Sequence, residues 1–205
     1  LAVRKAIRDF RPDVVWAGAD ALISIIGQNL AARHAIPCVI DLKDNYESFR
    51  LTRLPGIRSA LRRAIRNAQG VTCASSRLLE YAHNLGADSY GYVLPNAADG
   101  AIFRPMPAER ARRELGLPAS YLYIGIAGAL TRDRNIAVLT DAVSLLADRI
   151  PNIAFLVAGS RDKAWNPPSN LPVYDLGQIM VSRVALLFNA LDVGVICNRP
   201  GAFGS

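Results

Sequence analysis

Short apolar runs alternate with longer segments of helical periodicity along the first half of the chain. The continuous apolar character of these runs predicts strands that are buried on both faces. Asp20, and either Ser75 or Ser76, are placed to cap helices that follow two of the runs. The pattern predicts strands at residues 13–17, 38–42, 71–74 and 92–94, with helices at about 20–33, 57–67 and 76–86. This alternation is typical of a parallel, doubly wound α/β sheet.

The pattern is interrupted between residues 95 and 120, which contain four prolines and a single helical stretch at 108–115. Such a segment indicates a linker between two domains, although a long surface loop inside one domain fits the same pattern. Beyond it the alternation restarts, with strands predicted at 121–127, 153–158, 171–176 and 193–197 and helices at 133–148 and 181–191. We therefore predict two Rossmann-like domains in series, residues 1–104 and 105–205, each of them incomplete in this chain.

Composition places the chain among folded globular proteins, because 51% of its 205 residues are hydrophobic and 20% are charged. It begins with Leu1 and ends just after an apolar run, so we expect a piece of a longer protein. The sequence has no secretory signal pattern and no stretch of about 18 apolar residues. Cys38, Cys73 and Cys197 lie far apart in apolar runs, which predicts buried thiols in a reducing, cytoplasmic compartment.

The net charge of +7 favours anionic partners, and the distribution of this charge is uneven. Six arginines and no acid lie between Arg50 and Arg66. The predicted helix 57–67 places Arg58, Arg62, Arg63 and Arg66 away from its apolar positions, which is the pattern of a basic amphipathic helix. Either a solvated outer face or contact with an anionic membrane explains it. Nucleic-acid binding is not expected, because no aromatic platform accompanies the arginines.

Candidate ligand contacts follow the predicted strands of the second half. Gly128 ends a strand and opens a loop that carries Arg132 and Arg134 before a helix, which is an arrangement that suits a phosphate. Gly159 and Gly177 end two further strands at the same predicted sheet edge, where a nucleotide would lie. Ordinary tight turns and solvated arginines account for the same residues equally simply.

In the first half, Asp41, Lys43 and Asp44 follow a predicted strand, where an acceptor or a base is expected. A solvated loop is the alternative explanation. The sequence contains no His, Asp or Glu cluster that suggests a metal site.

Several motifs, taken in order, resemble those of glycosyltransferase family 4, retaining enzymes of GT-B architecture. Leu94 to Asp99 (LPNAAD), followed by Phe103 and Pro105, resembles the family's crossover segment. Residues 128–142 resemble its phosphate loop and helix. Further matches in the expected order are SSRL at 75–78, FLVAG at 155–159, LDV at 191–193 and FG at 203–204.

The sequence also departs from the family pattern. Arg134 stands where the family has a lysine on the donor diphosphate, and Asn135 replaces the usual glycine. Ala129 stands at a common arginine, and Lys43 lies near a common histidine. Gly201 occupies the position of the first glutamate of the Glu-x7-Glu motif, so no catalytic residue is assigned.

The resemblance implies transfer of a sugar, with retention, from a nucleoside-diphosphate sugar to a hydroxyl of a saccharide or lipid-linked acceptor in polysaccharide or glycolipid synthesis. It implies donor binding by Gly128, Arg132, Arg134, Gly159, Gly177, Phe203 and Gly204, acceptor-side roles for Asp41, Lys43 and Asp44, and no metal or other cofactor. A cytoplasmic enzyme on the inner face of the membrane is expected. The alternatives are a catalytically inactive nucleotide-sugar-binding protein of GT-B type and a nucleotide-sugar 2-epimerase.

Overall fold

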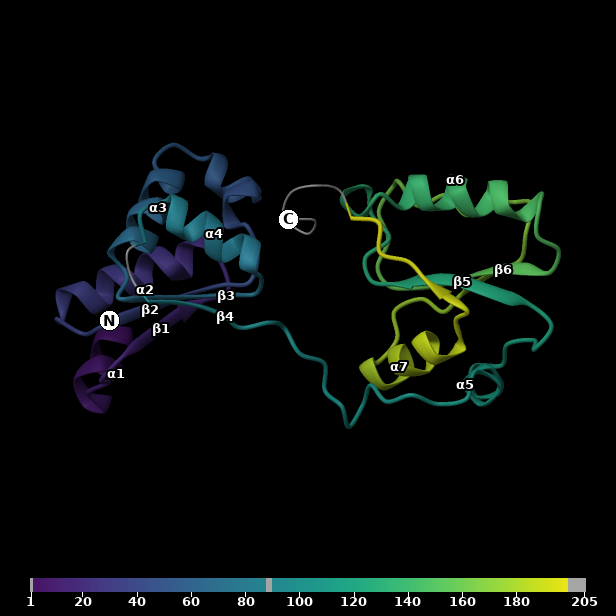
Figure 1. The fold of residues 1–205 in the computed structure, drawn as a ribbon, viewed down its shortest axis with the longest axis horizontal. Helices are drawn as coiled ribbons and strands as arrows, with labels where there is room; N and C mark the ends of the chain where they lie inside the picture. Colours follow the sequence, from purple (N-terminus) through teal and green to yellow (C-terminus); the bar gives the residue numbers. More distant parts are fainter. Residues whose placement is uncertain (1, 88–89, 199–205) are drawn as a thin grey trace. The chain divides into compact units, whose positions relative to one another are not determined.

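The computed structural model describes residues 2–87 and 90–198, which form two compact units (Figure 1). Unit 1 comprises the described residues up to Ala97, and unit 2 those from Ala98 onward. Each unit contains a four-stranded sheet, and every strand pair in both sheets is parallel. The predicted parallel α/β architecture in two successive units is therefore confirmed.

In unit 1 the strands are ordered as they follow in the chain. They are β1 (Val15–Gly18), β2 (Cys38–Leu42), β3 (Gly70–Cys73) and β4 (Tyr90–Val93). The helices that connect them are α2 (Ala21–Arg33), α3 (Ile57–Asn67) and α4 (Ser76–Asn84). The strand order runs in one direction, and parallel crossovers are right-handed as a rule, so helices α2, α3 and α4 cover one face of the sheet, as Figure 1 shows. A further helix, α1 (Ala2–Phe10), precedes β1, and the 3₁₀ turns η1 (Tyr46–Ser48) and η2 (Arg50–Arg53) lie between β2 and α3.

The two faces of this sheet have opposite character. Ile40 and Val71 are fully buried under the helices. On the other face, Trp16 is 59% exposed, Tyr90 81% and Tyr92 66%. These aromatic residues share a face because the strand register aligns Trp16 with Val39, and Val39 with Gly70 and then Tyr90. Within the described residues, the second face of unit 1 is therefore not covered by helices as a doubly wound sheet would be.

Unit 2 has helices on both faces of its sheet. The strands β5 (Leu122–Ala127), β6 (Ile153–Ala158), β7 (Val173–Asp175) and β8 (Val193–Gly194) are arranged in the order β7-β6-β5-β8. Figure 1 shows α6 (Ile136–Ala147) on one face and α5 (Ala108–Leu115) with α7 (Val181–Ala190) on the other. All six residues of β6 are buried between these layers. The strand order reverses at β5, which has β6 on one side and β8 on the other.

The division between the units falls between Ala97 and Ala98, earlier in the chain than the predicted boundary after residue 104. The segment that follows is attached to α7 of unit 2. The ring of Phe103 lies 6.4 Å from that of Phe188, and the side chain of Asn189 accepts a hydrogen bond from the Met106 N–H (2.8 Å). The same side chain donates to the Arg104 carbonyl oxygen (3.1 Å). These contacts are tertiary, so proline spacing alone did not indicate them.

Most predicted elements are present, with bounds that differ where the backbone departs from a regular helix or strand. The helix predicted from residue 133 starts only at Ile136, because Asn135 adopts a left-handed conformation with φ 54° after the 3₁₀ turn η3 (Arg132–Arg134). The strand predicted at 193–197 ends at Gly194. The hydrophobic pattern does not predict α1 or the 3₁₀ turns. No helix within the described ranges has the length and apolar content needed to cross a bilayer.

Candidate functional site

Glycines with positive φ end three neighbouring strands at one edge of the unit 2 sheet. Their φ angles are 144° at Gly128, 140° at Gly159 and 68° at Gly177, a region that side chains rarely adopt. The Gly128 N–H donates to the Ala158 carbonyl oxygen (2.9 Å), and the Gly159 N–H donates to that of Gly177 (2.8 Å). The structure therefore brings the three glycines predicted to contact a donor to one sheet edge.

Gly159 allows the two loops beyond β5 and β6 to come into direct contact. A Cβ atom at this position would lie 1.7 Å from the Gly128 carbonyl oxygen. Among the described residues other than its chain neighbours, no heavy atom lies within 4 Å of the corresponding position at Gly128, so this side of Gly128 is open toward them. The loops thus form a tightly packed backbone surface with free space next to Gly128.

Two pockets lie against this surface, both within unit 2. The larger, of about 450 Å³, lies beyond β5 and β6 and is lined by Ala127, Gly128, Ala129, Ala158, Gly159, Ser160, Gln178, Ile179 and Val184. The other, of about 340 Å³, is lined by Ile126, Ala127, Gly128, Ala129, Arg134, Phe188, Gly194, Val195, Ile196 and Asn198. This second pocket lies where the strand order reverses between β5 and β8. Parallel α/β sheets bind ligands at this switch point.

The two loop arginines differ in their surroundings. Arg134 is half-buried, lines the second pocket and donates from Nη1 to Asn198 Oδ1 (3.0 Å). Its carbonyl oxygen accepts a hydrogen bond from Cys197 Sγ (3.0 Å). Arg132 is exposed and lines neither pocket, while its N–H donates to Asp162 Oδ2 (3.1 Å). Of the two predicted phosphate contacts, Arg134 therefore lines one of these two pockets and Arg132 lines neither.

Several pocket residues were not predicted from the sequence. Asn198 and Phe188 line the second pocket, and Val184 lines the first. The position of Asn198 directly after an apolar run is a signal that it follows a strand. Phe188 and Val184 lie on a helix face, for which the sequence offers no comparable signal. The predicted donor residues Phe203 and Gly204, and Gly201 at the glutamate position, lie outside the described residues.

In unit 1, Asp41 and Lys43 form a polar group at the end of β2. The Asp41 side chain accepts a hydrogen bond from Thr72 Oγ1 (2.7 Å) and lies 3.5 Å from Lys43 Nζ. Asp41 is 8% exposed, and its burial is possible because a Cβ at the neighbouring Gly18 would lie 2.9 Å from Asp41 Cβ. Asp44 is half-buried next to this group. Burial and the nearby Asp41 charge raise the pKa of Cys73 to about 11.

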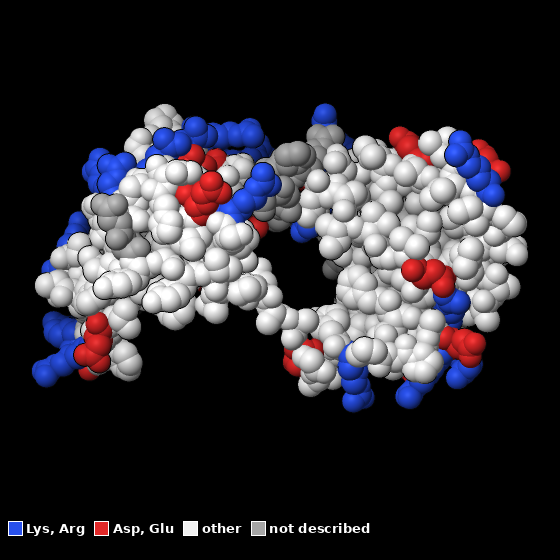
Figure 2. Space-filling view, in the orientation of Figure 1, with Lys and Arg blue, Asp and Glu red and all other residues white. Residues whose placement is uncertain are grey.

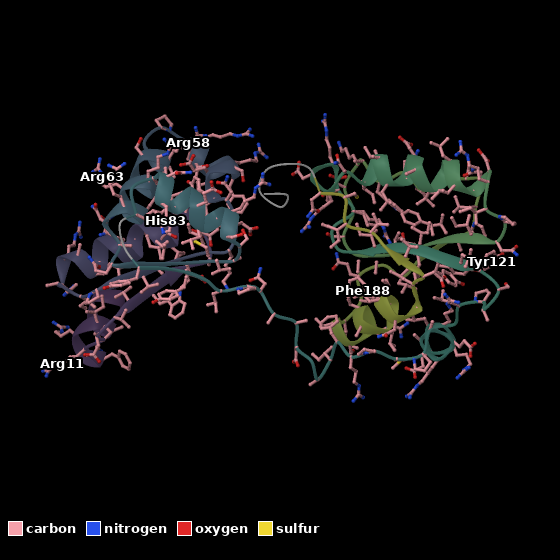
Figure 3. All side chains as sticks on the ribbon, viewed as in Figure 1. Arg11, Arg58, Arg63, His83, Tyr121 and Phe188 are labelled. Carbon is pink, nitrogen blue, oxygen red and sulfur yellow. The ribbon has the colours of Figure 1, made fainter. Side chains whose placement is uncertain are left out.

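The basic helix α3 is partly neutralised by Glu47, an acid that precedes the arginine run. Arg62 binds the Glu47 carboxylate with Nε (2.6 Å) and Nη2 (2.9 Å), and Arg58 Nε lies 3.8 Å from it. The Arg62 hydrogen bonds lower the pKa of Glu47. Arg66 donates to the Leu85 carbonyl oxygen (3.1 Å). Figure 2 shows basic side chains gathered over this part of unit 1, and Figure 3 shows Arg58 and Arg63 on the outward side of α3.

Of these four arginines, Arg63 alone makes no hydrogen bond or ion pair within residues 2–87 and 90–198. The same part of the chain contains no group of three His, Cys, Asp or Glu side chains that could hold a metal ion.

Comparison with known proteins finds similarity at the level of structure. No protein-family model and no curated protein matches the sequence. Sucrose-phosphate synthase from Thermosynechococcus elongatus aligns with a TM-score of 0.77 at 18% identity, over 99% of this chain and 54% of that protein. Anabaena HepE in complex with UDP aligns with a TM-score of 0.76 at 19% identity, over 99% of this chain and 57% of that protein. Trehalose 6-phosphate synthase from Burkholderia multivorans aligns with a TM-score of 0.70 at 10% identity, over 98% of this chain and 55% of that protein.

These alignments extend through both units, and the chain spans about half the length of the solved structures that it matches. At identities below 20%, the likeness concerns the fold. Two successive Rossmann-like units with parallel sheets, of this order and spacing, are the GT-B fold.

Proposed function

We propose that the protein containing this chain is a glycosyltransferase that moves a sugar from a nucleoside-diphosphate sugar to an acceptor hydroxyl. The observation that carries the proposal is the pocket at the β5–β8 switch point, which combines the open side of Gly128 with the side chain of Arg134. Solved structures of HepE with UDP and with UDP-glucose have the same fold, which supports a nucleotide sugar as the ligand.

In this proposal unit 2 binds the donor. The backbone at Gly128, Gly159 and Gly177 allows the diphosphate to approach the sheet edge closely, and the Arg134 guanidinium offsets its charge. A fixed cation acts most strongly on the charge that develops as the diphosphate departs, which is where stabilisation accelerates transfer. Side chains and backbone N–H groups take this role, so the proposed reaction needs no metal ion or other cofactor. We assign no catalytic residue.

Unit 1 provides the acceptor side in the same proposal. Asp41 and Lys43 lie together at the end of β2, within reach of a saccharide or lipid-linked acceptor that approaches this edge. Retention at the anomeric carbon, a role in polysaccharide or glycolipid synthesis, and a cytoplasmic place on the inner membrane face follow from the family resemblance and belong to the proposal.

The test is a titration of the full-length protein with UDP and with GDP. Arg134→Ala is expected to weaken nucleotide binding about tenfold to a hundredfold, because a charge-assisted hydrogen bond contributes roughly 1.5–3 kcal/mol. Arg132→Ala is the matched control, since its side chain is exposed and lies outside both pockets. Unchanged affinity of Arg134→Ala for both nucleotides would refute the assignment.

A second measurement separates the proposal from its alternatives. The full-length protein is incubated with UDP-glucose and candidate acceptors, and products are followed by NMR of the anomeric proton. A glycoside product supports transfer, and its coupling constant reports retention. Nucleotide binding without turnover would favour an inactive nucleotide-sugar-binding protein, and an altered configuration at C2 of the donor sugar would favour a 2-epimerase.

A further inference from the structure

The segment that follows β8 reaches from the sheet to the loop that carries Arg134. The Val195 N–H donates to the Gly125 carbonyl oxygen (2.9 Å), so the segment continues beside β5 after the strand ends. Cys197 packs against the apolar cluster between the sheet and α6, and Asn198 lines the pocket at the β5–β8 switch point. In Figure 1 the yellow segment after β8 lies beside the turn that leads into α6.

Two consecutive residues of this segment bind Arg134 at its two ends. The Cys197 thiol donates to the Arg134 carbonyl oxygen (3.0 Å), which attaches the segment to the backbone of η3. Asn198 Oδ1 accepts a hydrogen bond from Arg134 Nη1 (3.0 Å). The Arg134 N–H donates to the Thr131 carbonyl oxygen (3.0 Å). Contacts within unit 2 therefore fix both the backbone from which this side chain starts and the guanidinium in which it ends.

The kind of group that binds the guanidinium matters for the proposed donor site. A carboxamide oxygen accepts a hydrogen bond but carries no charge, so Asn198 orients Arg134 without cancelling its positive charge. A carboxylate in the same place would bind the guanidinium more strongly and would also neutralise it. An asparagine therefore fixes the cation and leaves it able to attract a phosphate.

A guanidinium that is held in place before the ligand arrives binds that ligand more tightly. An arginine side chain has many rotamers, and holding it in one of them costs conformational entropy. A hydrogen bond that already restricts the side chain in the unbound protein removes part of this cost from binding. Sugar transfer would benefit as well, because a fixed cation stabilises the departing diphosphate without having to reorganise.

We propose that Asn198 is a positioning residue that holds the Arg134 guanidinium in place for the donor diphosphate. The inference rests on the proposed function, because it takes the diphosphate to bind next to Arg134 in the pocket at the β5–β8 switch point. Asn198 acts in this inference through Arg134, and not through a contact of its own with the ligand.

The test is a double-mutant cycle, measured by calorimetry on the full-length protein with UDP and with GDP. Asn198→Ala is expected to weaken nucleotide binding about threefold to tenfold, as for the loss of one hydrogen bond. In the Arg134→Ala background the same substitution should change the affinity by less than about twofold, because its effect passes through the guanidinium. Asn170→Ala is the matched control, since this exposed carboxamide accepts from Ser144 Oγ (2.8 Å) and lines neither pocket of unit 2.

Asn198→Asp separates positioning from a purely structural role. The introduced carboxylate keeps the hydrogen bond to Arg134 and adds an ion pair, so the melting temperature should stay the same or rise. UDP and GDP should nevertheless bind about tenfold more weakly or worse, because the carboxylate neutralises the guanidinium and repels the diphosphate. A hydrogen bond that only stabilised the fold would leave nucleotide affinity intact in this variant.

Three results would each overturn the role of Asn198 alone. They are wild-type affinity of Asn198→Ala, wild-type affinity of Asn198→Asp, and an equal loss from Asn198→Ala with and without Arg134. The last result would mean that Asn198 contacts the nucleotide itself. Failure of the proposed donor site looks different, since Arg134→Ala would then bind both nucleotides as tightly as wild type. In that case the donor site and the positioning role are both wrong.

Discussion

Arg112 is a charged residue that unit 2 keeps almost entirely from solvent. It is 8% exposed, donates from Nε to the Ala190 carbonyl oxygen (3.0 Å) and from Nη2 to Asp192 Oδ2 (2.6 Å). Its guanidinium carbon lies 5.0 Å from the centre of the Tyr123 ring. The same Asp192 oxygen accepts from the Tyr123 N–H (2.7 Å). One side chain therefore connects α5, the end of α7 and the start of β8.

Replacing Arg112 tests how much this connection stabilises the unit. Arg112→Met is expected to lower the free energy of unfolding by about 2–4 kcal/mol, because it leaves a partly buried carboxylate without its cation. Arg110→Met on the same helix removes an exposed pair with Glu114 (2.8 Å) and should change stability by less than about 1 kcal/mol. Thermal unfolding of the two variants makes the comparison, and equal melting temperatures would contradict it.

Single residues also show how far the sequence predicts the site. Glycines after apolar runs identify the sheet edge directly, because a positive φ after a strand leaves a local signal. The distinction between Arg132 and Arg134 has no such signal. It arises because the backbone turns through η3 and Asn135, so that one side chain lines a pocket and the other points to solvent. Likewise, pairing of Glu47 with Arg62 joins residues fifteen positions apart and depends on tertiary packing.

At the scale of elements, α3 shows why an amphipathic pattern does not identify a binding face. Its bounds agree with the predicted helix 57–67, and its buried residues are apolar positions of the predicted pattern. The sequence pattern does not distinguish the arginines opposite that face, yet Arg58 and Arg62 contact Glu47 and Arg66 donates a hydrogen bond to the Leu85 carbonyl oxygen at the end of α4. In the run from Arg50 to Arg66, the arginines that make no side-chain hydrogen bond or ion pair with the described residues are Arg50 and Arg53 of η2 and Arg63 of α3.

The proposed membrane contact can be tested by comparing the arginines that have no partner with those that are paired within the protein. The triple substitution Arg50→Ala, Arg53→Ala and Arg63→Ala should weaken flotation of the full-length protein with anionic liposomes by about a hundredfold, at roughly 1 kcal/mol for each arginine near the surface. Its melting temperature should not change, because these exposed side chains make no hydrogen bond or ion pair with the described residues. Arg62→Ala is the comparison, since it breaks the Glu47 pair and should lower stability. Flotation that is unchanged by the triple substitution would exclude this surface as the membrane contact.

For the whole molecule, the structure narrows the connection between the units to residues 95–98. Leu94 is attached to unit 1 through its N–H, which donates to the Cys73 carbonyl oxygen (2.8 Å). Asp99 begins the segment held by unit 2, because its carbonyl oxygen accepts from the Phe103 N–H (2.8 Å). Residues 95–98 are exposed and make no backbone hydrogen bond with the described residues. Composition predicts a linker across residues 95–120. Only the tertiary contacts show that the part of it from Asp99 onward is held by unit 2.

Limited proteolysis examines this narrower linker. Elastase cleaves after small residues, so its first cut in the full-length protein is expected after Ala97 or Ala98 rather than after Ala101. Phe103→Ala should release the bound segment from α7 and add cleavage after Ala101. Mass spectrometry of the fragments identifies the bonds. A first cut after Ala101 in the wild type would mean that the segment is not held by Phe103 and Asn189.

The strand orders of the two sheets have a consequence for the rate at which each forms. In unit 1 neighbouring strands follow one another in the chain, and the bonds joining them, such as Thr72 to Asp41, span 31 positions. In unit 2, β8 must return to β5, and Arg112 meets Asp192 across 80 positions. Closing the longer loop costs roughly 0.8 kcal/mol more chain entropy. Folding slows as contacts become more distant in sequence. We therefore expect the sheet of unit 1 to form faster than the sheet of unit 2, in which the pairing of β8 with β5 forms last.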